Sequence, residues 1–210
     1  RSKSLDRNSY DAGDWFNLVD FSLDRHGWGR GLPHARDNEP RWDAMRSFLR
    51  DSTYAVGREH MEQAHAVFRE QLAVRYSTRL FQLGTADVIQ ERVAYHNTGP
   101  DQIPGLIAMT IGDGACSTFN GNLVLEFDRD YAGLLVLFNA DRAARTIDLD
   151  TLGLGDLPEL ELHPIQAESV DPVLRQAAYD DGTVTIPPLS APVFVAPATD
   201  GGGDFVCNER

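Results

Sequence analysis

Hydrophobic and polar positions divide the chain into three stretches, and the first stretch, residues 1–37, shows neither the alternation of a strand nor the period of a helix. It is rich in Asp, Arg, Gly, Asn and Trp. A long irregular segment in a compact fold is usually either functional or disordered. Its large aromatic rings argue against disorder, because such side chains are costly to leave in water. These rings belong to Tyr10, Trp15, Phe16 and Trp28. We therefore expect an ordered functional loop.

The second stretch, residues 38–78, has the periodicity of helices. Asn38-Glu39-Pro40 combines an N-cap residue, an acidic first turn and an early proline, which are signals for the start of a helix. A short amphipathic helix is predicted by the helical spacing of Trp42, Met45, Phe48 and Leu49. After Gly57 a longer helix is predicted, and its apolar stripe consists of Met61, Ala64, Phe68, Leu72 and the pair Arg75-Tyr76.

The third stretch begins near Leu80 and has the pattern of an antiparallel β protein. Short runs rich in strand-forming residues alternate with turn signals, which is typical of a β-sandwich. The predicted strands cover residues 88–95, 106–111, 123–127, 134–139, 146–149, 160–165, 183–186 and 193–195. The run Thr199–Asp204 is rich in glycine and predicts a flexible tail over residues 199–210.

The composition of the chain limits the classes of partner that it can bind. The 210 residues include 32 acidic and 19 basic side chains, so the formal net charge is −13. This charge argues against nucleic acid or an anionic membrane as a partner, because both recruit basic patches. No apolar run reaches the roughly 18 residues that predict a membrane span. Cys116 and Cys207 are too few for a disulfide scaffold; one bridge between them is left open, and two unpaired thiols are the simpler interpretation.

The predicted helices carry more apolar surface than the rest of the chain is expected to cover. Their stripes include Trp42, Phe48, Phe68 and Leu72, and a sandwich following them covers only part of such a surface. The chain also begins at Arg1 rather than at Met. We therefore expect a piece of a longer protein whose main body lies upstream.

The first 17 residues, RSKSLDRNSYDAGDWFN, closely resemble a signature of pullulanase-type α-1,6-glucosidases and plant limit dextrinases. These enzymes are debranching members of the α-amylase superfamily. The resemblance continues through Trp28–Pro33, Asn38–Met45, Arg75–Ser77, Arg92–Ile107 and Val193–Val195. It covers nearly the whole chain, and its motifs occur in order at suitable spacings.

The resemblance implies an α+β fragment of a (β/α)8 barrel enzyme. Residues 1–78 would end the catalytic barrel, with loop 1–37 after the eighth strand, beside the substrate cleft, and helices 38–78 closing the ring. Residues 79–198 would form the antiparallel β-sandwich of the C-terminal domain. A complete barrel needs roughly 250 residues, so the missing N-terminal barrel is an expected partner of this chain.

The opening loop contains the residue types that bind sugars. Sugar rings offer apolar C–H faces and many hydroxyls, which proteins meet with aromatic rings and with Asp, Asn and Arg. The resemblance implies contact with an α-glucan, and the expected substrate-binding residues are Arg7, Asn8, Asp11, Asp14, Trp15 and Asn17. In the structural alternative, Asp14 pairs with Arg7, while Trp15 and Phe16 anchor the loop. We prefer that alternative for Phe16.

Two positions of the loop depart from the family pattern. The family often has Asp at the position of Asn8, which has no carboxylate, and a basic residue at the position of Leu18. The missing cation weakens the case that a neighbouring charge holds Asp14 in place.

The chain lacks an evident catalytic pair. Retaining glycosidases need two opposed carboxyl groups about 5 Å apart, and the resemblance implies that the family's catalytic residues precede Arg1. Three pairs within the chain are poor substitutes: Asp11 and Asp14 share one loop, Glu59 and Glu62 lie on a solvated helix face, and Asp128 and Asp130 flank a turn. We predict no catalytic residue here and no activity of the 210-residue chain alone.

Metal and cofactor signals are weak. His60 and His65 are five residues apart, whereas two ligands on one helix face are four apart. His26 and His34 lie in the opening loop with Asp24 and Asp37, but a zinc site of these residues is not favoured. His96 in the resembled His-Asn-Thr-Gly turn is expected to be structural. No cofactor is predicted, and calcium binding at oxygen-rich turns stays open. The compartment, secreted or cytoplasmic, also stays open.

The main hypothesis is the C-terminal part of a debranching hydrolase that cleaves α-1,6-glucosidic bonds with retention. Its substrate would be an α-glucan such as pullulan, limit dextrin or the branches of amylopectin. The alternative is a non-catalytic carbohydrate-binding or structural β-sandwich module. A binding module should display aromatic residues on an exposed sandwich face, but Trp15, Trp28 and Trp42 all precede residue 80. Their positions favour a structural role for the sandwich.

Overall fold

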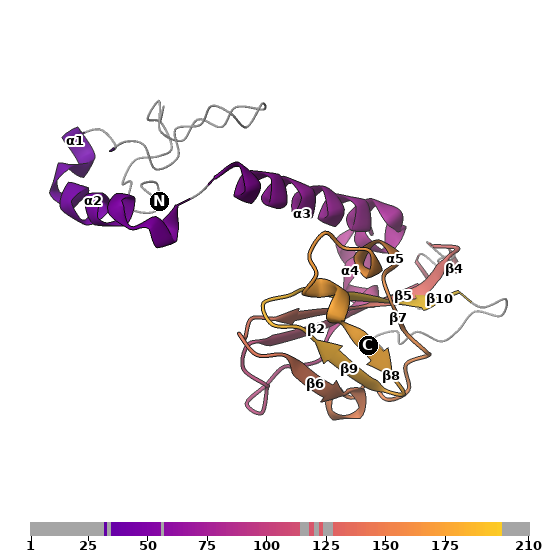
Figure 1. Cartoon of the computed structure of the whole chain (residues 1–210). Coiled ribbons are helices and arrows are strands. Elements are labelled where there is room, and N and C mark those ends of the chain that lie inside the picture. The colour runs from indigo at the N-terminus through magenta and orange to yellow at the C-terminus, as the bar shows by residue number, and fades with distance from the viewer. Residues whose placement is uncertain are drawn as a thin grey trace. The chain divides into compact units, whose positions relative to one another are not determined.

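The computed structural model describes residues 32, 35–55, 57–113, 118–119, 122–123 and 128–198. It forms two compact units, Arg1–Ala66 and Val67–Arg210, and the boundary falls within a helix (Figure 1). The predicted tail 199–210 and nearly all of the predicted loop 1–37 lie outside the described residues. Within the described part of the chain, no helix is both long and apolar enough to cross a membrane.

The first unit contains the predicted short helix. Its elements are α1 (Ala35–Asn38), the 3-10 helix η3 (Glu39–Arg41), α2 (Trp42–Arg50) and the 3-10 helix η4 (Ser52–Tyr54). Helical structure therefore begins at Ala35, inside the predicted loop. The expected cap at Asn38 is wrong, because its side chain makes no capping hydrogen bond and is buried. In α2, the charges of Asp43 in the first turn and of Arg50 in the last turn both interact favourably with the helix dipole.

Helix α3 (Arg58–Ser77) confirms the predicted longer helix after Gly57, but its buried face differs from the predicted stripe. Val74 is 5% exposed, whereas Phe68, Leu72 and Tyr76 of the stripe are 59%, 36% and 68% exposed. The packed face instead follows Val67, Glu70, Val74 and Ser77, which recur at helical spacing. The part of α3 in the second unit therefore has one packed face and one exposed apolar face.

The second unit is built on two antiparallel sheets. The larger has the order β1 (Val93–Tyr95), β2 (Leu106–Gly112), β5 (Tyr131–Asn139), β10 (Val193–Pro197) and β7 (Glu161–Leu162). The smaller has the order β6 (Arg145–Asp148), β9 (Thr183–Ile186) and β8 (Ala178–Asp180). A separate hairpin joins β3 (Thr118–Phe119) to β4 (Asn122–Leu123). This arrangement confirms the antiparallel, sheet-rich C-terminal domain.

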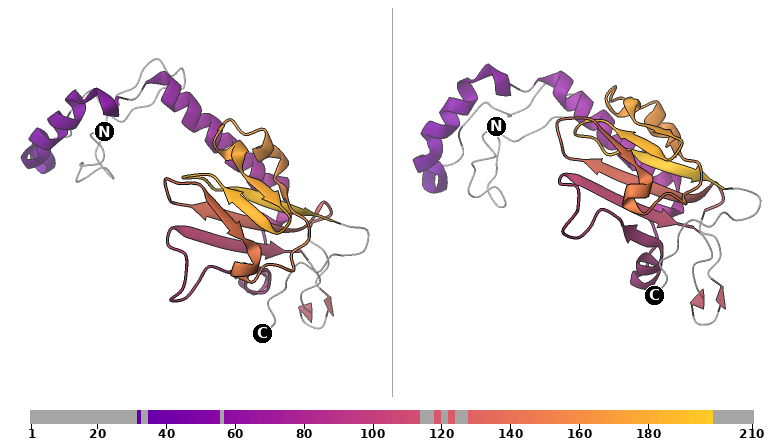
Figure 2. Two further views of the ribbon diagram at one scale, coloured as in Figure 1. Left: turned by 60° about the horizontal axis from the view of Figure 1, so that its bottom comes forward. Right: turned by 90° about the horizontal axis from the view of Figure 1, so that it is seen from below.

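Both faces of the five-stranded sheet are covered by other layers. Leu135 and Leu137 of β5 pack with the residues of the smaller sheet, and Figure 2 shows the two sheets as stacked layers. Leu134 and Val136, which point to the opposite face, pack with the helical segments instead. These segments are α3, the 3-10 helix η5 (Arg79–Phe81), α4 (Ala86–Arg92) and α5 (Pro164–Ala167). Because both faces are covered, every β5 residue from Gly133 to Leu137 is buried.

Several predicted strands need correction. Residues 88–95 form α4 followed by the short β1, because the Thr85 hydroxyl caps the helix by accepting a hydrogen bond from the Val88 N–H at 3.4 Å. Residues 160–165 form only the two-residue β7 before α5 begins at Pro164. In the run 123–127, β4 includes only the first residue, and the others lie outside the described part. Strand β8 was not predicted.

The predicted strands at 106–111, 134–139, 183–186 and 193–195 are confirmed as β2, β5, β9 and β10, and the run 146–149 is β6 shifted by one residue. Two further 3-10 helices, η6 (Leu149–Leu152) and η7 (Leu174–Gln176), lie in connections. The assignment of residues 1–78 to the end of a barrel stays a prediction.

Candidate functional site

The six predicted glucan-binding residues, Arg7, Asn8, Asp11, Asp14, Trp15 and Asn17, all lie outside the described residues. Cys116, Cys207, His26 and His34 also lie outside them. Candidate sites in the described part of the chain therefore come from the second unit, where a surface groove and several buried polar clusters accompany the sandwich.

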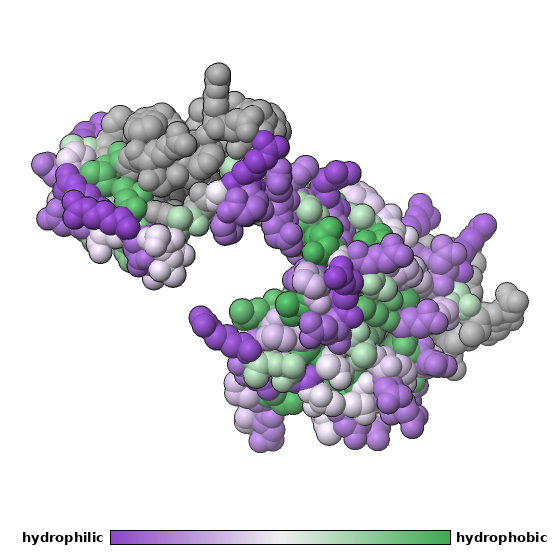
Figure 3. All heavy atoms as spheres, viewed as in Figure 1, coloured by the Kyte–Doolittle hydropathy of each residue, from purple (hydrophilic) through white to green (hydrophobic). Residues whose placement is uncertain are grey.

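A groove of about 580 Å³ opens between α3, one end of the five-stranded sheet and the segments around residues 171 and 190. We call it the α3 groove. Its apolar lining includes Val67, Val74, Phe81, Phe138, Leu174 and Leu189. Figure 3 shows hydrophobic surface beside the C-terminal half of α3. Phe138 is 41% exposed and Leu189 is 67% exposed.

Most of the polar residues that line the α3 groove already have partners within the domain. The Glu70 carboxylate accepts hydrogen bonds from the Ser169 hydroxyl at 2.8 Å and from the Val170 N–H at 2.9 Å. The Gln166 side chain bonds backbone groups of residues 191–193 at 3.1 and 2.7 Å. These contacts join α3 and α5 to neighbouring loops, so the groove is a rigid, mainly apolar surface.

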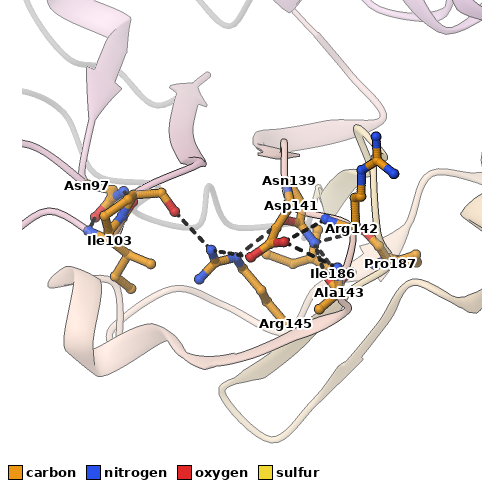
Figure 4. Close-up of polar contacts among 10 residues, drawn as sticks. Asn97, Ile103, Asn139, Asp141, Arg142, Ala143, Arg145, Ile186 and Pro187 are labelled. Carbon is orange, nitrogen blue, oxygen red and sulfur yellow. Dashed lines mark hydrogen bonds and ion pairs between the residues drawn. The ribbon is translucent and has the colours of Figure 1, made fainter.

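Asn139, at the end of β5, is one of the residues that line the groove, and its side chain organises the loop beside it (Figure 4). Its side-chain amide donates to the carbonyl oxygens of Ala143, Ile186 and Pro187 at 2.9, 3.3 and 3.0 Å. Its side-chain oxygen accepts from the Asp141 N–H at 3.0 Å and from Arg145 Nε at 3.3 Å. Asn139 is 2% exposed, so this network ties the two sheets together rather than facing a ligand.

The family-like His-Asn-Thr-Gly turn has a similar structural basis. Asn97 accepts from the Ile103 N–H at 2.7 Å and donates to two carbonyl oxygens of the same loop, at 2.8 and 2.7 Å (Figure 4). Arg145 continues the network to the Pro104 carbonyl at 2.9 Å and pairs with Asp141 at 3.0 Å. Every one of these side chains is used to hold loops, which explains the motif without a ligand.

A buried ion pair closes the other end of the large sheet. Arg92 of α4 contacts Asp113, which follows β2, at 3.2 Å, and the two side chains are 1% and 3% exposed. Arg92 also donates to the Gly112 carbonyl at 3.1 Å, and Asp113 accepts from the Asp128 N–H at 2.8 Å. Burial lowers the pKa of Arg92, and the charge of Asp113 opposes this effect.

Asp128 is the carboxylate nearest to this pair in the network, and all its bonds are structural. It accepts hydrogen bonds from the Thr78 hydroxyl and from the backbone N–H groups of Arg79, Asp130 and Tyr131, the last three at 3.1, 3.0 and 3.2 Å. A catalytic carboxyl group must face a substrate and exchange a proton. Asp113 instead holds the Arg92 cation, and Asp128 holds a hydroxyl and backbone N–H groups, so this cluster supports no glycosidic acid–base chemistry.

A serine–histidine pair, of which His163 is buried, joins α3 to α5. His163 Nε2 lies 2.9 Å from the Ser77 hydroxyl oxygen, and its Nδ1 accepts from the Ile165 N–H at 3.2 Å. With Nδ1 as acceptor, a neutral imidazole donates from Nε2 to Ser77, whose own hydroxyl donates to the Val74 carbonyl at 2.7 Å. The serine is therefore not activated as a nucleophile. Burial lowers the pKa of His163.

His96 has a structural contact of the same kind. Its Nε2 lies 2.7 Å from the hydroxyl oxygen of Thr110, which is 1% exposed, and burial lowers the pKa of His96. Among the described residues, no group of three or more His, Cys, Asp or Glu side chains is arranged to hold a metal ion.

The outer face of the smaller sheet tests the carbohydrate-binding alternative. Ile147, Val184 and Ile186 point inward and are buried. The alternating residues on the outer face are Thr146, Asp148, Ala178, Asp180, Thr183 and Thr185. This described face therefore has no aromatic ring on which a sugar could stack.

Together these features define a β-sandwich domain with an attached helical layer and structural polar clusters. The chain belongs to the family described as alpha-1,6-glucosidases, pullulanase-type, C-terminal, whose model matches residues 23–197. This membership confirms the family resemblance of the sequence. Pullulanase 1, chloroplastic, of Arabidopsis thaliana is 41% identical over 197 residues, which are 93% of this chain and 20% of that protein. A pullulanase of Klebsiella pneumoniae is 33% identical over 97% of this chain and 18% of its own length.

Solved structures agree with this assignment. PulA of Klebsiella oxytoca matches with a TM-score of 0.77 and 32% identity over 97% of this chain and 18% of that one. The maltotriose complex of PulA from Klebsiella pneumoniae matches with a TM-score of 0.75 and 32% identity, over 97% of this chain and 21% of that one. This chain thus spans about a fifth of the relatives and structures that it matches.

Proposed function

We propose that this chain is the C-terminal part of a debranching enzyme that hydrolyses α-1,6-glucosidic bonds of pullulan, limit dextrin or amylopectin branches with retention. The chain contributes the last loop of the substrate cleft, residues 1–37, and a β domain beside the barrel. The similarity to pullulanases supports this proposal, as does the pullulanase-type family model.

The observation that carries the proposal is the two-faced helix α3. One face packs on the sandwich through Val74, while Phe68, Leu72 and Tyr76 expose a continuous apolar stripe on another face. Large apolar side chains at helical spacing favour a second packing partner. A barrel that precedes α3 in the polypeptide is the partner that the family membership supports.

The bonds of the buried carboxylates indicate which part of the enzyme supplies the catalytic residues. In the described residues, the buried Asp113 and Asp128 are committed to structural bonds. The acid and the nucleophile, roughly 5 Å apart in a retaining enzyme, therefore come from the barrel. This chain's part is to bind and orient the glucan: Trp15 stacks on a sugar ring, and Arg7 and Asp14 hydrogen-bond sugar hydroxyls. Asn8, Asp11 and Asn17 add further hydrogen bonds.

Pullulan hydrolysis tests the proposal in two samples. The first is the 210-residue chain, which we expect to release no reducing sugar. The second is a chimera of Arabidopsis pullulanase 1 in which the matching fifth is replaced by this chain, and we expect it to hydrolyse pullulan. Substitution of Trp15→Ala in the chimera should raise KM, because a stacking surface is lost. Turnover by the chain alone, or an inactive but folded chimera, would contradict the proposal.

A further inference from the structure

We infer that the α3 groove is a docking site for an apolar, non-acidic segment of the catalytic part of the enzyme. The inference rests on the proposed function and adds a second contact to it. The exposed stripe of Phe68, Leu72 and Tyr76 lies on a face of α3 other than the one that lines the groove through Val67 and Val74.

The lining favours apolar side chains over a sugar. The groove, of about 580 Å³, has the size of a ligand pocket, for which about 300–1,000 Å³ is usual. However, Glu70, Gln166 and Asn139 already use their hydrogen-bonding groups within the domain. A sugar that entered would lose the hydrogen bonds of its hydroxyls to water with few replacements, and this loss is unfavourable. Apolar side chains have no such cost.

Charge selects among apolar segments. The lining residues include Glu70 and Asp171 but no lysine or arginine. Residues 67–210 as a whole contain 21 acidic and 9 basic side chains. An acidic segment would therefore be repelled, while a neutral segment or one flanked by lysine or arginine is complementary to the rim.

Leu189 marks the mouth of the groove. Its φ of 49° lies in the left-handed region, which is costly for a leucine. The Leu189 N–H donates to the Asp141 carbonyl at 2.9 Å, so the turn is held, and the side chain is 67% exposed. A bulky apolar residue in a costly conformation on the surface gains its stabilisation when another apolar surface covers it.

The segment that docks in the α3 groove is best supplied by the remaining polypeptide of the enzyme. This chain covers only 20% of Arabidopsis pullulanase 1 and 18% of the Klebsiella pneumoniae pullulanase. Four-fifths of such a protein is thus available to supply the segment. The same protein must also cover the neighbouring stripe of α3, so one partner body would meet both surfaces.

Leu189→Asp is the sharpest test, because aspartate tolerates the left-handed conformation better than leucine and adds a charge only at the groove. Its matched control is Ile89→Asp on α4, since Ile89 is 46% exposed and does not line the groove. Each substitution is made in the chimera and in the 210-residue chain. The chimera is followed by the half-life of pullulan hydrolysis during heating, and the chain by its urea midpoint.

We expect Leu189→Asp to shorten the half-life of the chimera about tenfold relative to Ile89→Asp, because a carboxylate is then buried in an apolar contact. In the 210-residue chain its urea midpoint should be unchanged or higher. Leu189→Asn, which keeps the backbone preference without the charge, should have an intermediate effect on the chimera.

Three results would overturn the inference. Equal half-lives for Leu189→Asp and Ile89→Asp in an active chimera would show that the groove is not covered, while the proposed function would stand. A lower urea midpoint of the Leu189→Asp chain would mean that residues of the chain itself fill the groove. If this loss grows with protein concentration, a second copy fills it. A folded but inactive chimera would refute the proposed function, and the inference with it.

Discussion

The two faces of the five-stranded sheet differ in how completely they are covered. Toward the smaller sheet, Leu135, Leu137 and Phe194 are fully buried in a core to which both sheets contribute. Toward the helices, Leu134 is also fully buried, but Ile107 and Phe138 on the same face are 51% and 41% exposed. The face toward the smaller sheet is thus fully covered, whereas the helical layer leaves apolar surface exposed for another domain to cover. This difference assigns stability to one face and assembly to the other.

The largest expected effect on stability comes from the face that packs against the smaller sheet. Phe194→Ala should lower the free energy of unfolding by about 3–5 kcal/mol, because it leaves a cavity among residues with little room to relax. Urea denaturation of the 210-residue chain measures this loss. A loss below about 1 kcal/mol would mean that the core between the sheets is loosely packed.

Removal of the buried cation should have a comparable but smaller effect. Arg92→Met eliminates the charge paired with Asp113 and leaves that carboxylate buried, which typically costs about 3 kcal/mol or more. The double variant Arg92→Met with Asp113→Leu should recover much of the loss, because no unpaired charge then stays buried. Urea midpoints of both variants test this expectation, and an absence of recovery would indicate a role beyond the ion pair.

Packing of the helical layer should contribute less. Val74→Ala removes two buried methyl groups where α3 meets the sheet, so the expected loss is about 1.5 kcal/mol. Phe68→Ser on the exposed stripe should change the stability of the isolated chain by less than about 0.5 kcal/mol. A larger loss for Phe68→Ser than for Val74→Ala would reverse the assignment of the two faces of α3.

The helical layer should also loosen in acid. Burial lowers the pKa of His163, so between the folded and unfolded values the unfolded chain binds a proton that the folded chain does not. The free energy of unfolding therefore falls as the pH drops below about 6.5, the ordinary value for histidine. His96, whose pKa is lowered in the same direction, adds to the slope. His163→Phe should flatten the dependence of the urea midpoint on pH; an unchanged slope would contradict this account.

Much of the fold was predictable because local patterns and tertiary contacts agree. The cores of β2, β5, β9 and β10 have apolar, strand-forming runs. The ends of β2, β9 and β10 were predicted to within two residues, and β5 begins three residues before its predicted start. Residues 88–95 failed because the strand-forming Val88-Ile89 was weighted above the capping Thr85. Strand β8 offers only Ala-Tyr-Asp, which is too short for a pattern.

The site residues show the limits of local signals. Phe68, Leu72 and Tyr76 form a more evident stripe than Val67 and Val74, so the sequence pattern did not identify the face of α3 that packs within this chain. The partners Ser77 and His163 are 86 residues apart, and no local pattern joins them. The glucan-binding residues of loop 1–37 were identified only through the family motif, and their roles stay a prediction.

The central claim is that the helical layer leaves apolar surface exposed in the isolated chain. Its most direct test is the binding of a fluorescent hydrophobic dye to the isolated chain and to the chimera with Arabidopsis pullulanase 1. We predict that the isolated chain binds the dye or associates through its exposed apolar surface, and that the chimera binds less dye because the catalytic part covers this surface. A monomeric isolated chain that melts cooperatively and binds no dye would contradict the account.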